Sequence, residues 1–137
     1  EINLWSDCQV VMHKPITEAT SRTAHIDNPM EMFAGLLYMP YKEDERTGGN
    51  FQIHNVKNDI TKVDMKNGRQ VYAEDLGDVH TTVPYKRNTF VMFCNCNANA
   101  VHSVSQRINP KLYRRSVNII AEFRRHYSKM YDVQEVR

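Results

Sequence analysis

The sequence contains few cysteines and no long apolar stretch. Its three cysteines, Cys8, Cys94 and Cys96, are odd in number and lack the spacing of a zinc site, which favours a reducing, intracellular setting. No apolar run approaches the ~18–20 residues that a membrane span requires, and the first residues do not form a signal peptide. We therefore expect a cytoplasmic protein without a membrane partner.

An excess of charge of either sign is also missing. Lys and Arg number 18 and Asp and Glu number 16, which gives a net charge of +2. This balance predicts no strong polyanion partner and makes nucleic-acid binding an unfavoured interpretation. Arg124, Arg125, His126 and Lys129 form one basic cluster, which a solvated helix face explains.

The length of 137 residues, with 41% apolar residues, predicts a single soluble domain over residues 1–137. The chain starts at Glu1, without an initiator methionine and in strand-like sequence. Such a start is typical of a fragment of a longer protein.

Short β-rich segments dominate the chain, with turn residues between them. Apolar or alternating runs predict strands at 9–12, 23–27, 33–39, 51–53, 89–93, 100–104 and 116–121. Residues 55–82 are more polar, and we interpret them as an insertion with a small hairpin whose turn is 66–69. Phe123, Tyr127 and Met130 recur at helical spacing, which predicts a short C-terminal helix over 122–131. Many short strands and one late helix favour a β-sandwich or barrel, most simply a double-sheet jelly roll.

A metal-binding pattern lies on two of these predicted strands. His25 and Asp27 are two residues apart, so an extended strand projects both side chains from one face. His102 lies in another strand, in apolar surroundings, and supplies a third ligand from across the fold. Two histidines and one carboxylate form the set that holds non-haem Fe(II) on one side and leaves positions open for chemistry. The alternative is a surface strand end for the first pair and a hydrogen-bonded core histidine for His102.

The other four histidines have no carboxylate in matching register. For His13, His54, His80 and His126 we favour a structural interpretation. Cys94 and Cys96 flank a polar loop, and we favour no metal site there.

In the order and spacing of its motifs the chain resembles the 2-oxoglutarate- and Fe(II)-dependent dioxygenases, and among them the prolyl-hydroxylase-like branch. The resemblance runs from about Thr23 to Ala121. It rests on residues 25–29, 36–40, 48–49, 83–84 with Asn88 and Phe93, 102–104 and 114–118.

The resemblance implies a cupin-like double-stranded β-helix, with His25, Asp27 and His102 as Fe(II) ligands and catalytic centre. It also implies that Arg114, Ser116 and Tyr38 bind 2-oxoglutarate, with O2 as the second co-substrate. The expected products are succinate, CO2 and a hydroxylated substrate, which is either peptidyl, with prolyl included, or small and amino-acid-like. Because Asp27 fills the position that related halogenases leave to a halide, hydroxylation is the expected outcome.

Strand parity selects Arg114 over Arg115 as the co-substrate anchor. Arg114, Ser116 and Asn118 share one face of the predicted strand, whereas Arg115 points to the other. A guanidinium forms a planar, charge-assisted pair with a carboxylate.

Relatives carry more structure before the His-x-Asp motif than the 24 residues found here, so part of the N-terminal support is expected to be missing. A homo-oligomer, a partner or a longer natural chain would supply it. We expect the loop 41–47 and the segment 55–82 to border the site. A non-catalytic metal-binding jelly-roll module, or a truncated family member acting as a binding protein, stays open as the alternative function, and a nucleic-acid demethylase is the third.

Overall fold

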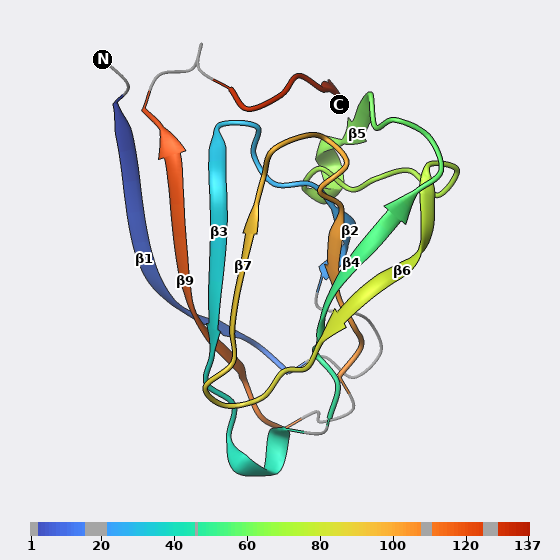
Figure 1. The fold of residues 1–137 in the computed structure, drawn as a ribbon. Helices are drawn as coiled ribbons and strands as arrows, with labels where there is room; N and C mark the ends of the chain where they lie inside the picture. The colour runs from blue at the N-terminus through green and yellow to red at the C-terminus, as the bar shows by residue number, and fades with distance from the viewer. Residues whose placement is uncertain (1–2, 16–21, 46, 108–110, 125–128) are drawn as a thin grey trace.

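Two antiparallel four-stranded sheets enclose the candidate site. The computed structural model describes residues 3–15, 22–45, 47–107, 111–124 and 129–137. The larger sheet has the order β1-β9-β3-β7, with bounds Leu4–His13, Arg114–Phe123, Glu31–Tyr38 and Phe90–Cys94. The smaller sheet has the order β2-β8-β4-β6, with bounds Arg22–His25, His102–Val104, Phe51–Val56 and Leu76–Val83. Figure 1 shows the two groups of strands on opposite sides of the molecule. The expectation of a mainly β fold is confirmed.

The larger sheet is held by long, regular ladders. All of β1 pairs with β9, from Leu4 opposite Phe123 to His13 opposite Arg114. On its other side β9 pairs with β3, which in turn pairs with β7. The runs predicted as strands at 9–12, 33–39, 89–93 and 116–121 lie in this sheet, and those at 23–27, 51–53 and 100–104 correspond to strands of the smaller sheet. In both sheets the strands pack one face against the molecule's interior.

The predicted C-terminal helix is wrong for the residues that the structure describes. β9 continues through Phe123, and the Arg124 N–H donates to the carbonyl of Asn3. Residues 129–131 are not helical, and 125–128 lie outside the described residues. Phe123 belongs to β9, and the pairing of β9 with β1 satisfies the backbone hydrogen-bonding groups that a helix would otherwise satisfy.

Residues 55–82 contribute two further strands and part of a core. They contain β5 (Lys62–Asp64), the 3₁₀ helix η2 (Met65–Asn67) and β6. Asp64 and Gln70 exchange backbone hydrogen bonds around the expected turn. β5 pairs in parallel with β10 (Gln134–Val136), and a second 3₁₀ helix, η1, spans Lys42–Asp44. No helix among the described residues is long and apolar enough to traverse a membrane.

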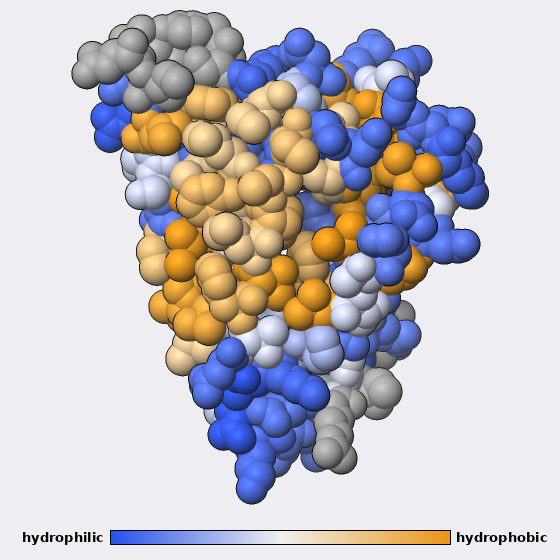
Figure 2. Space-filling view, viewed as in Figure 1, coloured by the Kyte–Doolittle hydropathy of each residue, from blue (hydrophilic) through white to orange (hydrophobic). Residues whose placement is uncertain are grey.

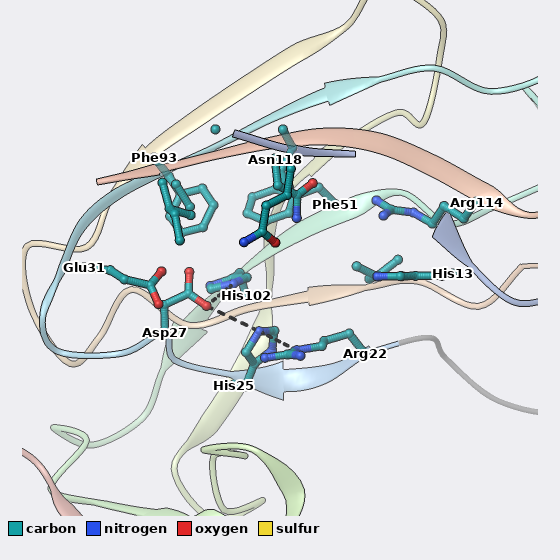
Figure 3. Close-up of a pocket in the computed structure, with 16 residues that line it drawn as sticks. His13, Arg22, His25, Asp27, Glu31, Phe51, Phe93, His102, Arg114 and Asn118 are labelled. Carbon is teal, nitrogen blue, oxygen red and sulfur yellow. Dashed lines mark hydrogen bonds and ion pairs between the residues drawn. The ribbon is translucent and has the colours of Figure 1, made fainter. Parts of the chain in front are cut away.

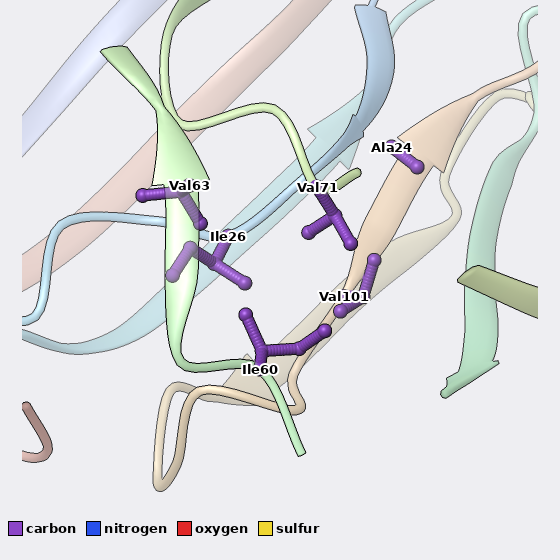
Figure 4. Close-up of a cluster of buried hydrophobic side chains, with 6 residues drawn as sticks. All are labelled: Ala24, Ile26, Ile60, Val63, Val71 and Val101. Atoms are coloured by element: carbon purple, nitrogen blue, oxygen red, sulfur yellow. The ribbon is translucent and has the colours of Figure 1, made fainter. Parts of the chain in front are cut away.

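Buried apolar side chains form two clusters, one on each side of the smaller sheet. One cluster, drawn in Figure 4, joins residues 55–82 to β2 and β8 and contains Ala24, Ile26, Ile60, Val63, Val71 and Val101. The other lies between the sheets and contains Tyr38, Phe51, Tyr85 and Val91. The first cluster, here called the Ile26 cluster, makes residues 55–82 part of the support of β2 and β8.

Truncation of Val63 tests the role of the Ile26 cluster. Val63 is fully buried. Val63→Ala removes two methyl groups and leaves a cavity, so we expect the free energy of unfolding to fall by about 2 kcal/mol. The matched control is Val79→Ala on β6, where Val79 is 42% exposed and a change below about 0.5 kcal/mol is expected. Urea titration measures both, and equal losses would contradict this role.

Candidate metal centre

Three side chains converge between the sheets. His25 is the last residue of β2, Asp27 lies two residues further on, and His102 begins β8 directly opposite His25. His25 Nε2 and His102 Nε2 lie 3.7 and 3.5 Å from the same Asp27 oxygen, Oδ1. All three donor atoms lie within 4.8 Å of one another, so the group can hold a metal ion. Adjacent ligands at about 2.1 Å from a metal are roughly 3 Å apart, which small side-chain rotations would achieve here.

The alternation of side chains explains this convergence. Ala24, Ile26 and Val101 point into the Ile26 cluster, so the residues between and beside them face the opposite side. His25, Asp27 and His102 consequently face the space between the sheets. The parity argument holds although β2 ends at His25, because Ile26 N–H donates to the Arg69 carbonyl and keeps the backbone extended past the strand end.

Backbone carbonyls orient both imidazoles. His25 Nδ1 lies 2.7 Å from the Thr23 carbonyl oxygen, and His102 Nδ1 lies 3.1 Å from that of Ala100. In a neutral imidazole these contacts place the proton on Nδ1 and leave a lone pair on Nε2, which in His25 accepts a hydrogen bond from Arg22 Nε. Metal-ligating histidines are commonly fixed in this way.

The electrostatics favour a neutral histidine beside a charged carboxylate. Burial, together with His102 and Arg22, lowers the pKa of His25 to about 3, so the imidazole is neutral at neutral pH. Burial alone would raise the pKa of Asp27, but the contact with His102 and the positive charge of Arg22 lower it overall. Neither group therefore has to lose a proton before it binds a metal at neutral pH.

The three residues line a cavity of about 250 Å³ between the sheets. Figure 3 shows Asp27 and Glu31 toward one end, Arg114 and His13 toward the other, and the two ligand histidines between them. Its lining residues are Gln9, His13, Arg22, His25, Asp27, Glu31, Ala34, Gly35, Leu36, Phe51, Phe93, His102, Val104, Arg114, Asn118 and Ile120.

Two irregular strand pairings add charged groups to the cavity. The register of β2 on β8 shifts between Arg22 and His25, and that of β3 on β9 shifts between Glu31 and Phe33. Such irregularities re-aim side chains, and both Arg22 and Glu31 line the cavity. Arg22 Nε donates to His25 Nε2 at 2.9 Å. Strict alternation would place neither residue there.

Arg114 is a buried cation. It is 3% exposed, its Nε donates to the Gly49 carbonyl, and its guanidinium lies 5.0 Å from the ring centres of both Tyr38 and Tyr85. Among the described residues no carboxylate pairs with Arg114, and its Nη2 atom is buried without a hydrogen-bond partner. A buried cation without an anion is costly, which points to an anionic ligand.

The neighbours of Arg114 are equally buried. The Tyr38 hydroxyl has no hydrogen-bond partner among the described residues, and Ser116 Oγ donates to Asn118 Oδ1 at 2.7 Å. Tyr38 and Ser116 are register partners beside the cavity and do not line it. Gly49 has a φ of +74°, and a Cβ there would lie 2.8 Å from Arg107 Cγ, so glycine is required for the two arginines to pack.

Arg115 is placed away from the cavity. Its guanidinium lies 3.6 Å from the ring centre of Tyr41, and its backbone N–H donates to the Tyr85 hydroxyl. The two adjacent arginines therefore face opposite sides of β9, as alternation along the strand requires.

Other expectations about the site differ from the structure. Among the described residues of 41–47 and 55–82, none lines the cavity, whereas His13 does. His13 lies four residues after Gln9, so alternation along β1 places both side chains on the inward face of the strand. The sequence could have indicated this placement. His54 does not line the cavity, and its Nε2 contacts Ser103 Oγ. The three cysteines, Cys8, Cys94 and Cys96, are exposed free thiols.

Comparisons of the chain with protein-family models, with curated proteins and with solved structures gave no match. The geometry of the site therefore carries the functional argument.

Glu31 gives the cavity a measurable pH dependence. Burial, with the charges of Asp27 and Glu122, raises its pKa from 4.5 to about 7. A raised carboxyl pKa means that the stability associated with this group is present below about pH 4.5 and is lost as pH rises through about 7. Glu31→Gln cannot titrate, so between pH 4.5 and 8 we expect its stability relative to the parent protein to rise by roughly 1–2 kcal/mol, allowing for partial exposure.

Urea titrations of the metal-free protein at several pH values measure this difference. Glu74→Gln, at an exposed position, is the matched control. The same pH trend in both variants would contradict the assignment.

Proposed function

We propose that the chain is an Fe(II)- and 2-oxoglutarate-dependent dioxygenase that hydroxylates a C–H bond of a peptidyl or small amino-acid-like substrate and releases succinate and CO2. One observation carries the proposal. A single cavity contains both the His25–Asp27–His102 group and the unpaired, buried guanidinium of Arg114. The first can hold a metal, and the second is suited to a carboxylate.

The strand order supports a double-stranded β-helix. The antiparallel pairs β1 with β9, β2 with β8, β3 with β7 and β4 with β6 are nested along the chain and alternate between the two sheets. Such nesting is expected when a long hairpin folds over into a jelly roll. His25 ends β2, Asp27 follows that strand, and His102 begins β8, which neighbours β2 in the smaller sheet and does not lie across the fold as the sequence suggested.

The donor set suits Fe(II). His25, His102 and Asp27 would hold the ion through two imidazole nitrogens and one carboxylate oxygen, and three ligands on one side leave positions open for a chelating co-substrate and O2. Bound in this way, the iron supplies the oxidising chemistry that couples decarboxylation of 2-oxoglutarate to C–H hydroxylation. The protein contributes ligand orientation through the Thr23 and Ala100 carbonyls.

Arg114 would bind the distal carboxylate of 2-oxoglutarate. Its free Nη2 is a buried polar atom that an anion in the cavity would satisfy, whereas the Tyr38 hydroxyl, also without a partner, lies outside the lining and would have to turn toward that anion to bind it. Ser116 would contribute indirectly, because its hydroxyl donates a hydrogen bond to the side-chain amide of Asn118, which lines the cavity. The cavity volume is slightly below the range typical of drug-sized ligands, as expected for a small co-substrate.

Aromatic and charged residues complete the site. The rings of Phe93 and Phe51 lie 4.6 and 5.3 Å from the His102 ring, between centroids. They shield this side of the site from water. When His25 Nε2 ligates a metal, Arg22 has to release that nitrogen, and its guanidinium then becomes available to a substrate.

Anaerobic titration tests both ligands together. With Fe(II) and 2-oxoglutarate we expect the weak visible charge-transfer band of a chelated keto acid. His25→Ala should abolish the band because one of three ligands is lost. His80→Ala, at an exposed position on β6, is the matched control and should retain it. A band unaffected by His25→Ala would contradict the metal assignment.

Two adjacent arginines provide a second test. Arg114→Ala removes the buried cation, so we expect 2-oxoglutarate affinity to fall about 100-fold, which corresponds to about 3 kcal/mol. Arg115→Ala changes a residue of the opposite face and should alter the affinity less than about threefold. Growth of the charge-transfer band as 2-oxoglutarate is added measures both constants, and the reverse ranking would contradict the role of Arg114.

Turnover distinguishes an enzyme from a binding module. Succinate release is measured with panels of peptides and free amino acids, and mass spectrometry detects one added oxygen. Stimulated succinate release with a hydroxylated product is the expected result. Metal and 2-oxoglutarate binding without stimulated release would favour a non-catalytic binding module.

A further inference from the structure

The direction of the Asp27 carboxylate depends on the backbone that carries it. The rings of His25 and His102 are oriented by carbonyl oxygens outside the metal site. Within the described part of the chain, the Asp27 carboxylate has ion-pair contacts with these two histidines alone. Asp27 also follows the last residue of β2, so no strand pairing fixes its carbonyl group. The contacts of the surrounding segment therefore decide where this ligand points.

The Asp27 carbonyl accepts a hydrogen bond from a residue near the end of the chain. The Tyr131 hydroxyl donates to this carbonyl oxygen at 2.9 Å, across 104 positions of the sequence. The same hydroxyl lies 3.4 Å from Asn95 Oδ1. Because a tyrosine hydroxyl has a single proton to donate, the shorter contact with Asp27 takes it.

Asn95 holds the rest of the segment that follows Asp27. Its side chain is fully buried, and Nδ2 donates to the carbonyls of Asn28 and Glu31 at 2.9 and 3.1 Å. These two bonds fix the orientation of the amide and turn its Oδ1 toward Tyr131. One buried amide and one hydroxyl thus hold the loop that carries a ligand.

Residues 129–137, here called the C-terminal tail, are themselves anchored on both sides of Tyr131. The Met130 N–H donates to the Pro29 carbonyl at 2.8 Å, and further on β10 pairs with β5, which the tail reaches in Figure 1. The side chains of Tyr131 and Val133 pack against the Ile26 cluster. Figure 2 shows hydrophobic residues gathered mainly over the larger sheet, away from β5. Particular contacts, and not a broad apolar surface, therefore hold the tail.

We propose that the C-terminal tail belongs to the metal centre, with Tyr131 as a positioning residue that holds Asp27 in the direction required of a ligand. This role rests on the metal assignment of the proposed function. Groups that orient metal ligands typically change metal affinity by roughly 10–100-fold when they are removed. Tyr131 acts through a backbone carbonyl, so we expect an effect at the lower end of that range.

Titration with Co(II) in the absence of 2-oxoglutarate tests the role. Tyr131→Phe removes the hydroxyl and keeps the ring, so Co(II) affinity should fall about tenfold. The visible Co(II) absorption should also change in intensity, because the carboxylate is less well directed at the ion. Tyr85→Phe is the matched control, since the Tyr85 hydroxyl also donates to a backbone carbonyl, that of Arg115, and Tyr85 does not line the cavity. This variant should bind Co(II) as the parent protein does.

The outcomes separate this role from the metal assignment. Urea titration of each variant shows that it is folded. Parent-like affinity in Tyr131→Phe, or equal losses of affinity in the two variants, would overturn the role of Tyr131 and leave the metal assignment standing. A parent protein that binds no Co(II) would overturn the metal assignment and this role with it.

Amide hydrogen exchange tests the same coupling without a substitution. A coupling between two sites is reciprocal, so Co(II) binding should slow exchange in peptides of the C-terminal tail by up to about tenfold. Peptides of β6, at the edge of the smaller sheet, serve as the control and should change little. Unchanged exchange in the tail, or equal slowing in β6, would contradict the coupling.

Discussion

The alternation of side chains over residues 24–27 and 101–102 is the constraint on which the site depends. Ile26 and Val101 are fully buried in an apolar cluster, and their neighbours His25, Asp27 and His102 are thereby directed to the other side. A slip of one residue would bury the ligands in hydrocarbon and expose the core, so the register is strongly specified. The packing of the Ile26 cluster therefore also fixes the direction of the ligands. Ile60, Val63 and Val71 support the site through this packing, although they do not line the cavity.

The second organising feature is a buried charge without a partner. Arg107 satisfies its charge with Asp44, but the Arg114 guanidinium lies between two tyrosine rings with one nitrogen unsatisfied. A buried cation without a partner is unfavourable for folding, so it is expected at a site where a bound ligand supplies the missing partner. The cavity thus combines a group able to hold a metal with a site prepared for an anion, which is the physical basis of the proposed co-substrate.

Much of this arrangement could be predicted from the sequence. Apolar runs identified the strands of the larger sheet, and two-residue spacing brought His25 and Asp27 together and separated Arg114 from Arg115. β6 was not recognised because most of its residues are exposed and polar. Arg22 and Glu31 could not be placed in the cavity, since strand irregularities arise from pairing with a neighbouring strand and leave no mark in the local pattern. The C-terminal helix was predicted from residues whose first member, Phe123, pairs within a sheet.

The central claim is that His25 and His102 bind a metal through Nε2 while their Nδ1–H groups donate to backbone carbonyls. Proton NMR of the Co(II)-loaded protein tests it most directly, because paramagnetically shifted imidazole N–H signals arise only from ligating histidines. We expect two such signals that disappear in D2O, with one lost in His25→Ala and the other in His102→Ala. No shifted exchangeable signal, or two signals that survive both substitutions, would contradict it.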